Sequence, residues 1–397
     1  MGILGGFLMK NHYFLSQPHQ PFFVLAFINA IISIFIFSLL LKGTITSEVL
    51  SANYHAYSLI FLMFTPAFFA FLFTTFPRFS ANPPIEKIVY LTILVPFVVG
   101  SFFFLFGTLT FSALASIGMV ITLIGHLLGI NILRKLYKAS TIEDKHDIFW
   151  ILLSMSAGGV AHLLFVIGYF ANSIWLISFA IQIAIYLYLF LVAFSVAQRM
   201  VPFFSHRMIE RDELFVRNIA LLLVGHIILE IIKPHLSFIA DFALMYIIAN
   251  EILEWELPFP NPNPLLWILH LSLFWVPVAF LFSGLTSIIS IFSDINFMFL
   301  DIHILVLGFV FTVLIGFGTR VTLGHSGNKL EADRLTTILF YWTQVVVISR
   351  MVTSLIFSFG WNFLFWFDIT VTAWLVLFGV WAYRFFGVLI FGRKLES

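Results

Sequence analysis

The sequence contains no cysteine among its 397 residues, and this absence removes several kinds of site. Disulfides, thiolate-bound zinc, cysteine-bound iron–sulfur clusters and covalently attached c-type haem all need cysteine sulfur. Any metal must therefore be held by histidine, methionine, tyrosine or carboxylate side chains. The 12 histidines are enough for such a site.

Charged residues are also scarce. They make up 10% of the chain, whereas soluble domains carry about 25%. Because 61% of the residues are hydrophobic, the lipid bilayer is the expected solvent. The net charge of +1 gives no reason to expect a nucleic-acid partner. The sequence also lacks a glycine-rich phosphate-binding loop, which argues against an ATP-driven pump.

Long apolar runs predict an all-α integral membrane protein, a bundle of about twelve transmembrane helices. A run of about 20 apolar residues is long enough to cross a bilayer. We expect one polytopic membrane domain over residues 1–397, with an N-terminal tail at 1–21, helices within 22–391 and a short C-terminal tail at 392–397. The predicted spans are 22–41, 56–76, 88–107, 110–131, 148–170, 174–197, 217–232, 236–251, 265–290, 298–318, 335–358 and 365–391.

The distribution of positive charge predicts how the bundle is oriented. With the N-terminus in the cytoplasm, only Lys42 and Lys233 of the 20 lysines and arginines fall on the outer side. Arg350 lies within a span, and all others fall on the inner side. This bias predicts that both termini are cytoplasmic. The first span follows a polar stretch and lacks a small-residue cleavage site, so we expect it to be retained.

Histidines near the ends of predicted spans are the candidate ligands. The orientation places His55 and His303 at one level near the outer face. It places His270 and His325 at a second level near the inner face. Two imidazoles at one level can ligate a haem or a copper ion. The competing interpretation is that these histidines form hydrogen bonds between helices or at the interface.

The other histidines are interpreted as structural. They lie in predicted loops or tails, or within spans without a partner at the same level. The first group comprises His12, His19, His146, His206 and His235, and the second comprises His126, His162 and His226.

Three arginines have special positions. Arg199 and Arg320 each end a predicted span at the inner face, where they either anchor the helix or bind an anionic group such as a haem propionate. Arg350 is costly within a span unless it is paired. We expect it to form an ion pair with one of three acids placed toward the outer side: Glu230, Asp241 or Asp301.

Several segments, taken together and in order, resemble the NnrS family of membrane proteins. The most specific is DIHILVLGFVFTVLIGFGTRVTLGHSG, in which a histidine-led helix ends in a TR-x-x-LGH-S-G tail. The segments cover residues 20 to about 330. They are QPFF at Gln20–Phe23, YHAYSLIF near His55, TTFPRFSANPPI, RMVPFF at Arg199–Phe204, NPLLWILHLSLFW around His270, and the Asp301–Gly327 segment.

The resemblance implies a twelve-helix protein of the bacterial inner membrane that contains haem and copper and acts in the response to nitric oxide. The cofactor would be a non-covalent b-type haem, with copper as a possible second metal. The expected partners are the lipid bilayer and nitric oxide or another small gas. The resemblance points to these positions for cofactor binding: His55, His270, His303, His325, Arg199 and Arg320.

The chain departs from the family pattern at one important point. Around His55 the family usually reads Trp-His-Ala-His-Glu-Met, whereas Tyr57 stands here in place of the second histidine. In the fifth span the family often has a histidine at the position of Val166, and this chain has His162 one helical turn earlier. A site that needs both histidines of the family motif cannot form here in the same way.

Two other functions compete with the haem interpretation. Twelve spans with buried polar residues fit a secondary transporter of a metal, haem or small solute, for which Gln182, Glu230, Gln344 and Arg350 would line a path. A scaffold for other membrane enzymes is the third interpretation. A full oxygen-reducing centre is disfavoured, because the sequence has neither an adjacent histidine pair nor a His-Pro-Glu-Val-Tyr motif.

Overall fold

The computed structural model describes residues 13–207 and 212–395, and every regular element within those residues is a helix. Most of the predicted N-terminal tail, including His12, lies outside the described residues. The elements are η1 (Tyr13–Leu15), α2 (His19–Leu41), α3 (Ser51–Tyr57), η2 (Ser58–Phe64), α4 (Thr65–Phe79), α5 (Lys87–Leu109), α6 (Ser112–Ala139), α7 (His146–Phe170), α8 (Ile174–Gln182), η3 (Ile183–Phe190), α9 (Leu191–Phe204), α10 (Phe215–Ile232), α11 (Phe238–Glu254), α12 (Pro264–Ser293), α13 (Leu300–His303), η4 (Ile304–Phe311), α14 (Thr312–His325), α15 (Arg334–Ser358) and α16 (Leu364–Phe391).

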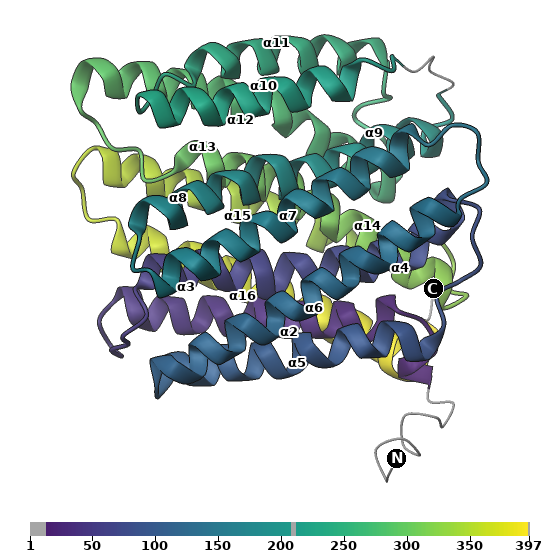
Figure 1. Ribbon diagram of the computed structural model, residues 1–397. Coiled ribbons are helices and arrows are strands. Elements are labelled where there is room, and N and C mark those ends of the chain that lie inside the picture. The colour runs from purple at the N-terminus through teal and green to yellow at the C-terminus, as the bar shows by residue number, and fades with distance from the viewer. Residues whose placement is uncertain (1–12, 208–211, 396–397) are drawn as a thin grey trace.

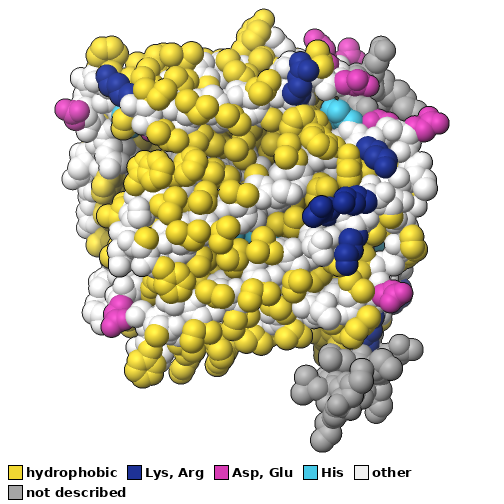
Figure 2. Space-filling view, in the orientation of Figure 1, with side chains coloured by type: hydrophobic (Ala, Val, Ile, Leu, Met, Phe, Trp, Pro, Cys, Tyr) yellow, Lys and Arg dark blue, Asp and Glu magenta, His cyan; other side chains and the backbone are white. Residues whose placement is uncertain are grey.

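Eleven helical segments in the described residues are long and apolar enough to cross a membrane, so the chain is a multi-pass membrane protein. All run roughly side by side (Figure 1). A belt of hydrophobic side chains covers much of one face, with lysine and arginine gathered mainly toward one end (Figure 2). Seven of the spans are buried over half of their length or less, so their outer faces would contact lipid: α2, α5, α6, α10, α12, α15 and α16.

The predicted eighth span corresponds to α11, which is the shortest of the long helices. Its 17 residues extend about 26 Å, near the lower limit for crossing the hydrocarbon layer. It packs between α10 and α12 along one side of the bundle (Figure 1). The start of α2 and the end of α16 lie at the same end of the molecule. The count of twelve membrane crossings and the cytoplasmic location of both termini remain predictions.

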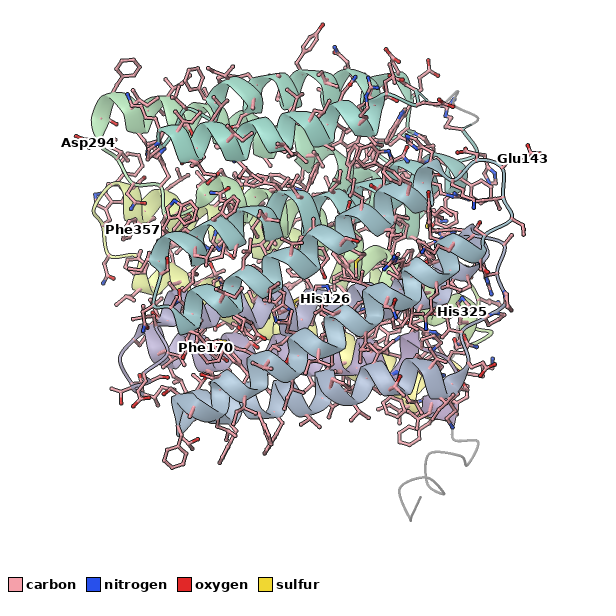
Figure 3. All side chains as sticks on the ribbon, in the orientation of Figure 1. His126, Glu143, Phe170, Asp294, His325 and Phe357 are labelled. Atoms are coloured by element: carbon pink, nitrogen blue, oxygen red, sulfur yellow. The ribbon has the colours of Figure 1, made fainter. Side chains whose placement is uncertain are left out.

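The two ends of the bundle are named here by the histidines that mark them. The His303 end also contains Phe170, Asp294 and Phe357, whereas the His325 end also contains Glu143 (Figure 3). His126 lies between the two ends in the same view. This arrangement gives each candidate residue a depth along the helices.

Three of the spans contain a π-helical segment between two α-helical ones. These segments are η2, η3 and η4. A π-turn widens the helix and leaves carbonyls that the α-pattern would have satisfied, and such turns occur often at functional sites. Side chains take up some of these carbonyls: Thr65 donates to the Ile60 carbonyl, five residues earlier, at 2.9 Å. Asn29 of α2 donates to the Leu62 carbonyl at 2.6 Å. These three segments belong to the interior of the bundle, where they shape the sites.

Helices α5 and α6 approach so closely that glycine is required at their contact. A β-carbon on Gly118 would lie 2.7 Å from the carbonyl oxygen of Gly100 and 2.9 Å from the Cα atom of Phe104. Both are backbone atoms, so a side chain at Gly118 could be accommodated only if the helices separated.

Gly118→Ala should therefore destabilise the bundle by about 1–3 kcal/mol, the usual cost of overpacking. Gly225→Ala in α10 is the matched control, because no atom lies within 4 Å of the added carbon. Thermal unfolding in detergent measures both variants. Equal unfolding temperatures for the two would contradict the close approach of α5 and α6.

Candidate functional site

His55 of α3 and His303 of α13 lie together at the His303 end, at the common level that the sequence predicts. Their ring centres are 6.1 Å apart and their planes differ by 19°. The far side of the His55 ring stacks on Phe37 of α2, with ring centres 4.2 Å apart. We refer to these two residues as the His55–His303 pair.

Both rings of the pair have nitrogens that are free to bind a ligand. His303 Nδ1 lies 2.7 Å from the Phe299 carbonyl oxygen, so Nδ1 carries the proton and donates it. This leaves Nε2 as a bare acceptor, the arrangement that metal-binding histidines commonly use. His55 Nδ1 is buried and has no hydrogen-bond partner among the described residues.

Arg350 of α15 does not form the ion pair that the sequence suggests. Within the described part of the chain, its guanidinium donates to Ser354 Oγ and, at 3.0 Å, to the Met298 carbonyl. The three acids that were its expected partners are not bonded to it. Asp241 pairs with His226, Glu230 accepts a hydrogen bond from the backbone of His235, and Asp301 lies 3.5 Å from Ser283 Oγ.

His325 lies beside His19 rather than beside His270. The ring centres of His19 and His325 are 5.1 Å apart, at 51°. His19 is the first residue of α2 and is buried, although the sequence places it in the N-terminal tail. Its Nδ1 has no partner among the described residues. The His325 end therefore contains a second histidine pair, which sequence reasoning missed.

His270 of α12 is fully buried and uses both of its ring nitrogens. Nε2 lies 2.7 Å from Ser205 Oγ, and Nδ1 lies 3.1 Å from the Pro258 carbonyl oxygen. These bonds connect α12 to the end of α9 and to the loop after α11. His270 would have to give up one of them to bind a metal.

Arg199 and Arg320 both lie against aromatic rings. Arg199 forms an ion pair with Asp147 of α7 at 2.7 Å and lies 4.5 Å from the ring centre of Phe79. Arg320 lies 4.0 Å from the ring centre of Phe204. The charge of Arg199 is thus neutralised locally, whereas Arg320 has no carboxylate partner among the described residues.

A third histidine pair occupies the buried middle of the bundle. His126 Nδ1 lies 3.2 Å from His162 Nδ1, and His162 Nε2 lies 2.9 Å from the Tyr57 hydroxyl. That hydroxyl also lies 3.2 Å from the Met119 carbonyl oxygen. All three side chains are fully buried, and His126 Nε2 has no partner among the described residues. Tyr57, which departs from the family motif, thus forms part of this chain of hydrogen bonds.

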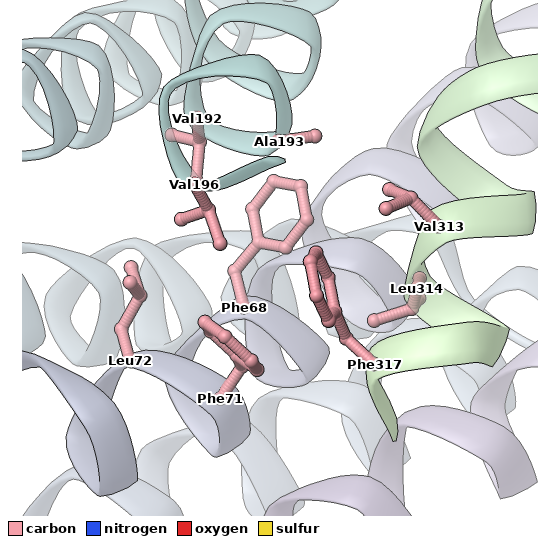
Figure 4. A pocket seen from close by; sticks show the side chains of 9 residues that line it. All are labelled: Phe68, Phe71, Leu72, Val192, Ala193, Val196, Val313, Leu314 and Phe317. Carbon is pink, nitrogen blue, oxygen red and sulfur yellow. The ribbon is translucent and has the colours of Figure 1, made fainter. Parts of the chain in front are cut away.

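A small apolar cavity lies where α4, α9 and α14 meet. Its volume is about 30 Å³, above the ~10–15 Å³ that a water-sized molecule needs. Phe68 and Phe71 face Val192, Val196 and Phe317 across it (Figure 4). No polar atom lines the cavity, so water would have no hydrogen-bond partner there. It suits an apolar guest of a few atoms.

No three His, Asp or Glu side chains among the described residues are arranged to hold a metal ion together. Six histidines instead form three pairs, and the two members of each pair come from different spans: His19 with His325, His55 with His303, and His126 with His162. A bare ion that needs three or four protein ligands does not fit these pairs. They fit a group that supplies most of its own coordination.

A comparison with protein families finds one match: the family model described as NnrS protein matches residues 13–393, nearly the whole chain. A comparison with curated proteins finds no match. The family match includes the His55–His303 pair, the His19–His325 pair and the buried His126–His162 pair.

Tyr57→Phe tests the central hydrogen-bond chain. Removal of the hydroxyl leaves His162 Nε2 buried without a partner, which should cost about 1–3 kcal/mol of stability. Tyr383→Phe is the control, because the Tyr383 side chain is exposed. Thermal unfolding in detergent should show a lower midpoint for Tyr57→Phe only. An unchanged midpoint would mean that this bond contributes nothing.

Proposed function

The chain belongs to the NnrS protein family, and from that premise we propose that it is a haem-binding protein that acts on nitric oxide within the bilayer. The observation that carries the proposal is the His55–His303 pair, in which two spans present unengaged imidazole nitrogens at one level. The bacterial inner membrane and the nitrosative stress response belong to the same proposal.

The donor set fits haem in particular. Haem would supply most of the coordination of its own iron, so two histidines would be enough to hold it. The ring centres of His55 and His303 lie 6.1 Å apart, so both imidazoles could bind one group held at this level. Haem would supply an iron that binds a diatomic gas when one axial position is open or displaceable.

The residues around the pair hold the ligands in place. The Phe299 carbonyl orients His303, and the Phe37 ring supports His55 from behind. Such outer contacts set the tautomer and the direction of a ligating histidine. The protein's part in the chemistry is thus to orient two imidazoles and to exclude water.

The remaining predicted site residues have supporting places in this proposal. His325, with His19, would bind a second metal such as copper at the opposite end. His270 would act through its bonds to Ser205 and Pro258. Arg320 is the better placed of the two inner arginines for an anionic group, since Arg199 already pairs with Asp147.

The proposed gas also suits the interior of the bundle. Nitric oxide is a small uncharged molecule, and an apolar cavity without polar partners holds such a guest in preference to water. The cavity between α4, α9 and α14 has this character. The gas would reach it from the bilayer without crossing a polar barrier.

The transporter interpretation retains one supporting observation. A buried network joins His226 of α10, Asp241 of α11 and Ser283 of α12, with Asp241 accepting hydrogen bonds of 2.7 and 2.9 Å. Intramembrane ionisable residues often line a transport path. Uptake of labelled solutes into proteoliposomes, compared with haem content, would separate the two functions.

His303→Asn should reduce the haem content of the purified protein about tenfold or more, because the variant loses one of the two imidazoles that would hold the haem. The difference spectrum of dithionite-reduced and oxidised protein measures haem per chain. His235→Asn is the matched control at the same end of the bundle. Asparagine is used in both because the backbone of His235 is left-handed, with φ of +68°, a conformation that asparagine tolerates.

Equal haem in the two variants would remove His303 from the ligands. A wild-type protein that is colourless after expression in haem-replete cells would overturn the proposed function itself. In that case the transporter assay becomes the decisive measurement.

A further inference from the structure

Arg350 carries a buried positive charge that no acid neutralises within the described residues. The side chain lies within a membrane span and is only 9% exposed. A charged group at such a position is costly and normally has a partner. Two other arginines of this chain have such a partner: Arg199 pairs with Asp147, and Arg384 pairs with Asp333.

The hydrogen bonds of Arg350 leave part of its guanidinium unused. The group has five N–H donors in a planar fork. Among the described residues, its acceptors are Ser354 Oγ and the Met298 carbonyl, both of them neutral. The remaining donors are the kind that bind a carboxylate or another oxyanion through two parallel bonds.

Arg350 belongs to the same local structure as the His55–His303 pair. Met298 and Phe299 are consecutive residues with left-handed backbones, with φ of +51° and +56°. The Met298 carbonyl accepts from Arg350, and the Phe299 carbonyl accepts from His303.

Two adjacent carbonyls of one strained segment thus orient the arginine and the histidine together. Non-glycine residues in this conformation are uncommon and cluster where a ligand is held. The strain is maintained because both carbonyls are engaged by side chains of the site.

We propose that Arg350 binds a carboxylate or similar oxyanion belonging to a ligand held at the His55–His303 pair. If the proposed function holds, that group is a propionate of the haem, and the inference rests on the proposed function to that extent. The same donors would otherwise bind a free oxyanion at the His303 end of the bundle. In either case, the ligand supplies the negative charge that no acid among the described residues provides to Arg350.

Reconstitution of the haem-free protein with haem and with haem dimethyl ester tests the proposal. The ester has the same ring and iron but no carboxylate. Wild type should bind haem about tenfold or more tightly than the ester, since a charge-assisted bond to a buried guanidinium is lost. Arg350→Gln should bind the two equally, with its affinity for the ester unchanged. Ser354 Oγ also donates to the Met298 carbonyl, at 3.3 Å, so this segment keeps one contact with α15 in the variant.

Arg384→Gln is the control, because Arg384 of α16 is already paired with Asp333, the residue that precedes α15. It should discriminate between haem and ester as wild type does. A merely structural role for Arg350 would weaken the binding of both porphyrins by the same factor. That result would overturn the propionate assignment.

A second arm tests a free oxyanion with formate, the smallest carboxylate, added to the haem-free proteins. A formate-dependent rise in the unfolding temperature of wild type, absent in Arg350→Gln, would identify a free anion as the ligand. If wild type binds neither porphyrin, the proposed function fails, and the formate experiment alone decides whether Arg350 binds an anion. No discrimination between porphyrins together with no formate effect would overturn the inference.

Discussion

The constraint that shapes this protein is the absence of water from the hydrocarbon layer. A polar group there must find a partner inside the protein or remain unsatisfied at considerable cost. Much of the described chain meets this demand through contacts between helices. Thr65 and Asn29 take up carbonyls in the π-helical segment η2, and His270 uses both ring nitrogens. The packing of the spans is therefore tied to specific polar contacts as well as to apolar surface.

Against that background, three buried histidines stand out. His19, His55 and His126 each have a buried nitrogen without a partner among the described residues. Each of them lies beside another histidine from a different span. A ligand that binds at such a pair would offset the cost of leaving these nitrogens buried.

The sequence predicts well how deep a residue lies along its membrane span. It predicts poorly which face of the helix the residue lies on. Hydropathy predicts each long span, with ends up to eight residues from those observed, and the common depth of His55 and His303 follows from the order of crossings. Depth alone also suggested His270 with His325 and Arg350 with an acid. Neither contact is present among the described residues, because residues at one level can lie on opposite faces of their helices. The sequence places His19 in the N-terminal tail, because the polar residues His19 and Gln20 lower the local hydropathy at the start of α2.

The same reasoning separates the two strongest functional interpretations. The network of His226, Asp241 and Ser283 is satisfied within the protein, since each of these side chains engages another and Ser283 Oγ also lies 3.5 Å from Asp301 of α13. A network satisfied in this way stabilises the packing of α10, α11 and α12 without any ligand. The group of His55, His303 and Arg350 is open: it combines unengaged imidazole nitrogens with an unneutralised guanidinium. An open group gains stability only when a ligand brings both a metal and a negative charge, which is the chemistry of a porphyrin with carboxylate arms. The unengaged nitrogens and the unneutralised guanidinium therefore favour cofactor binding at the His303 end over a transport path through α10 to α12.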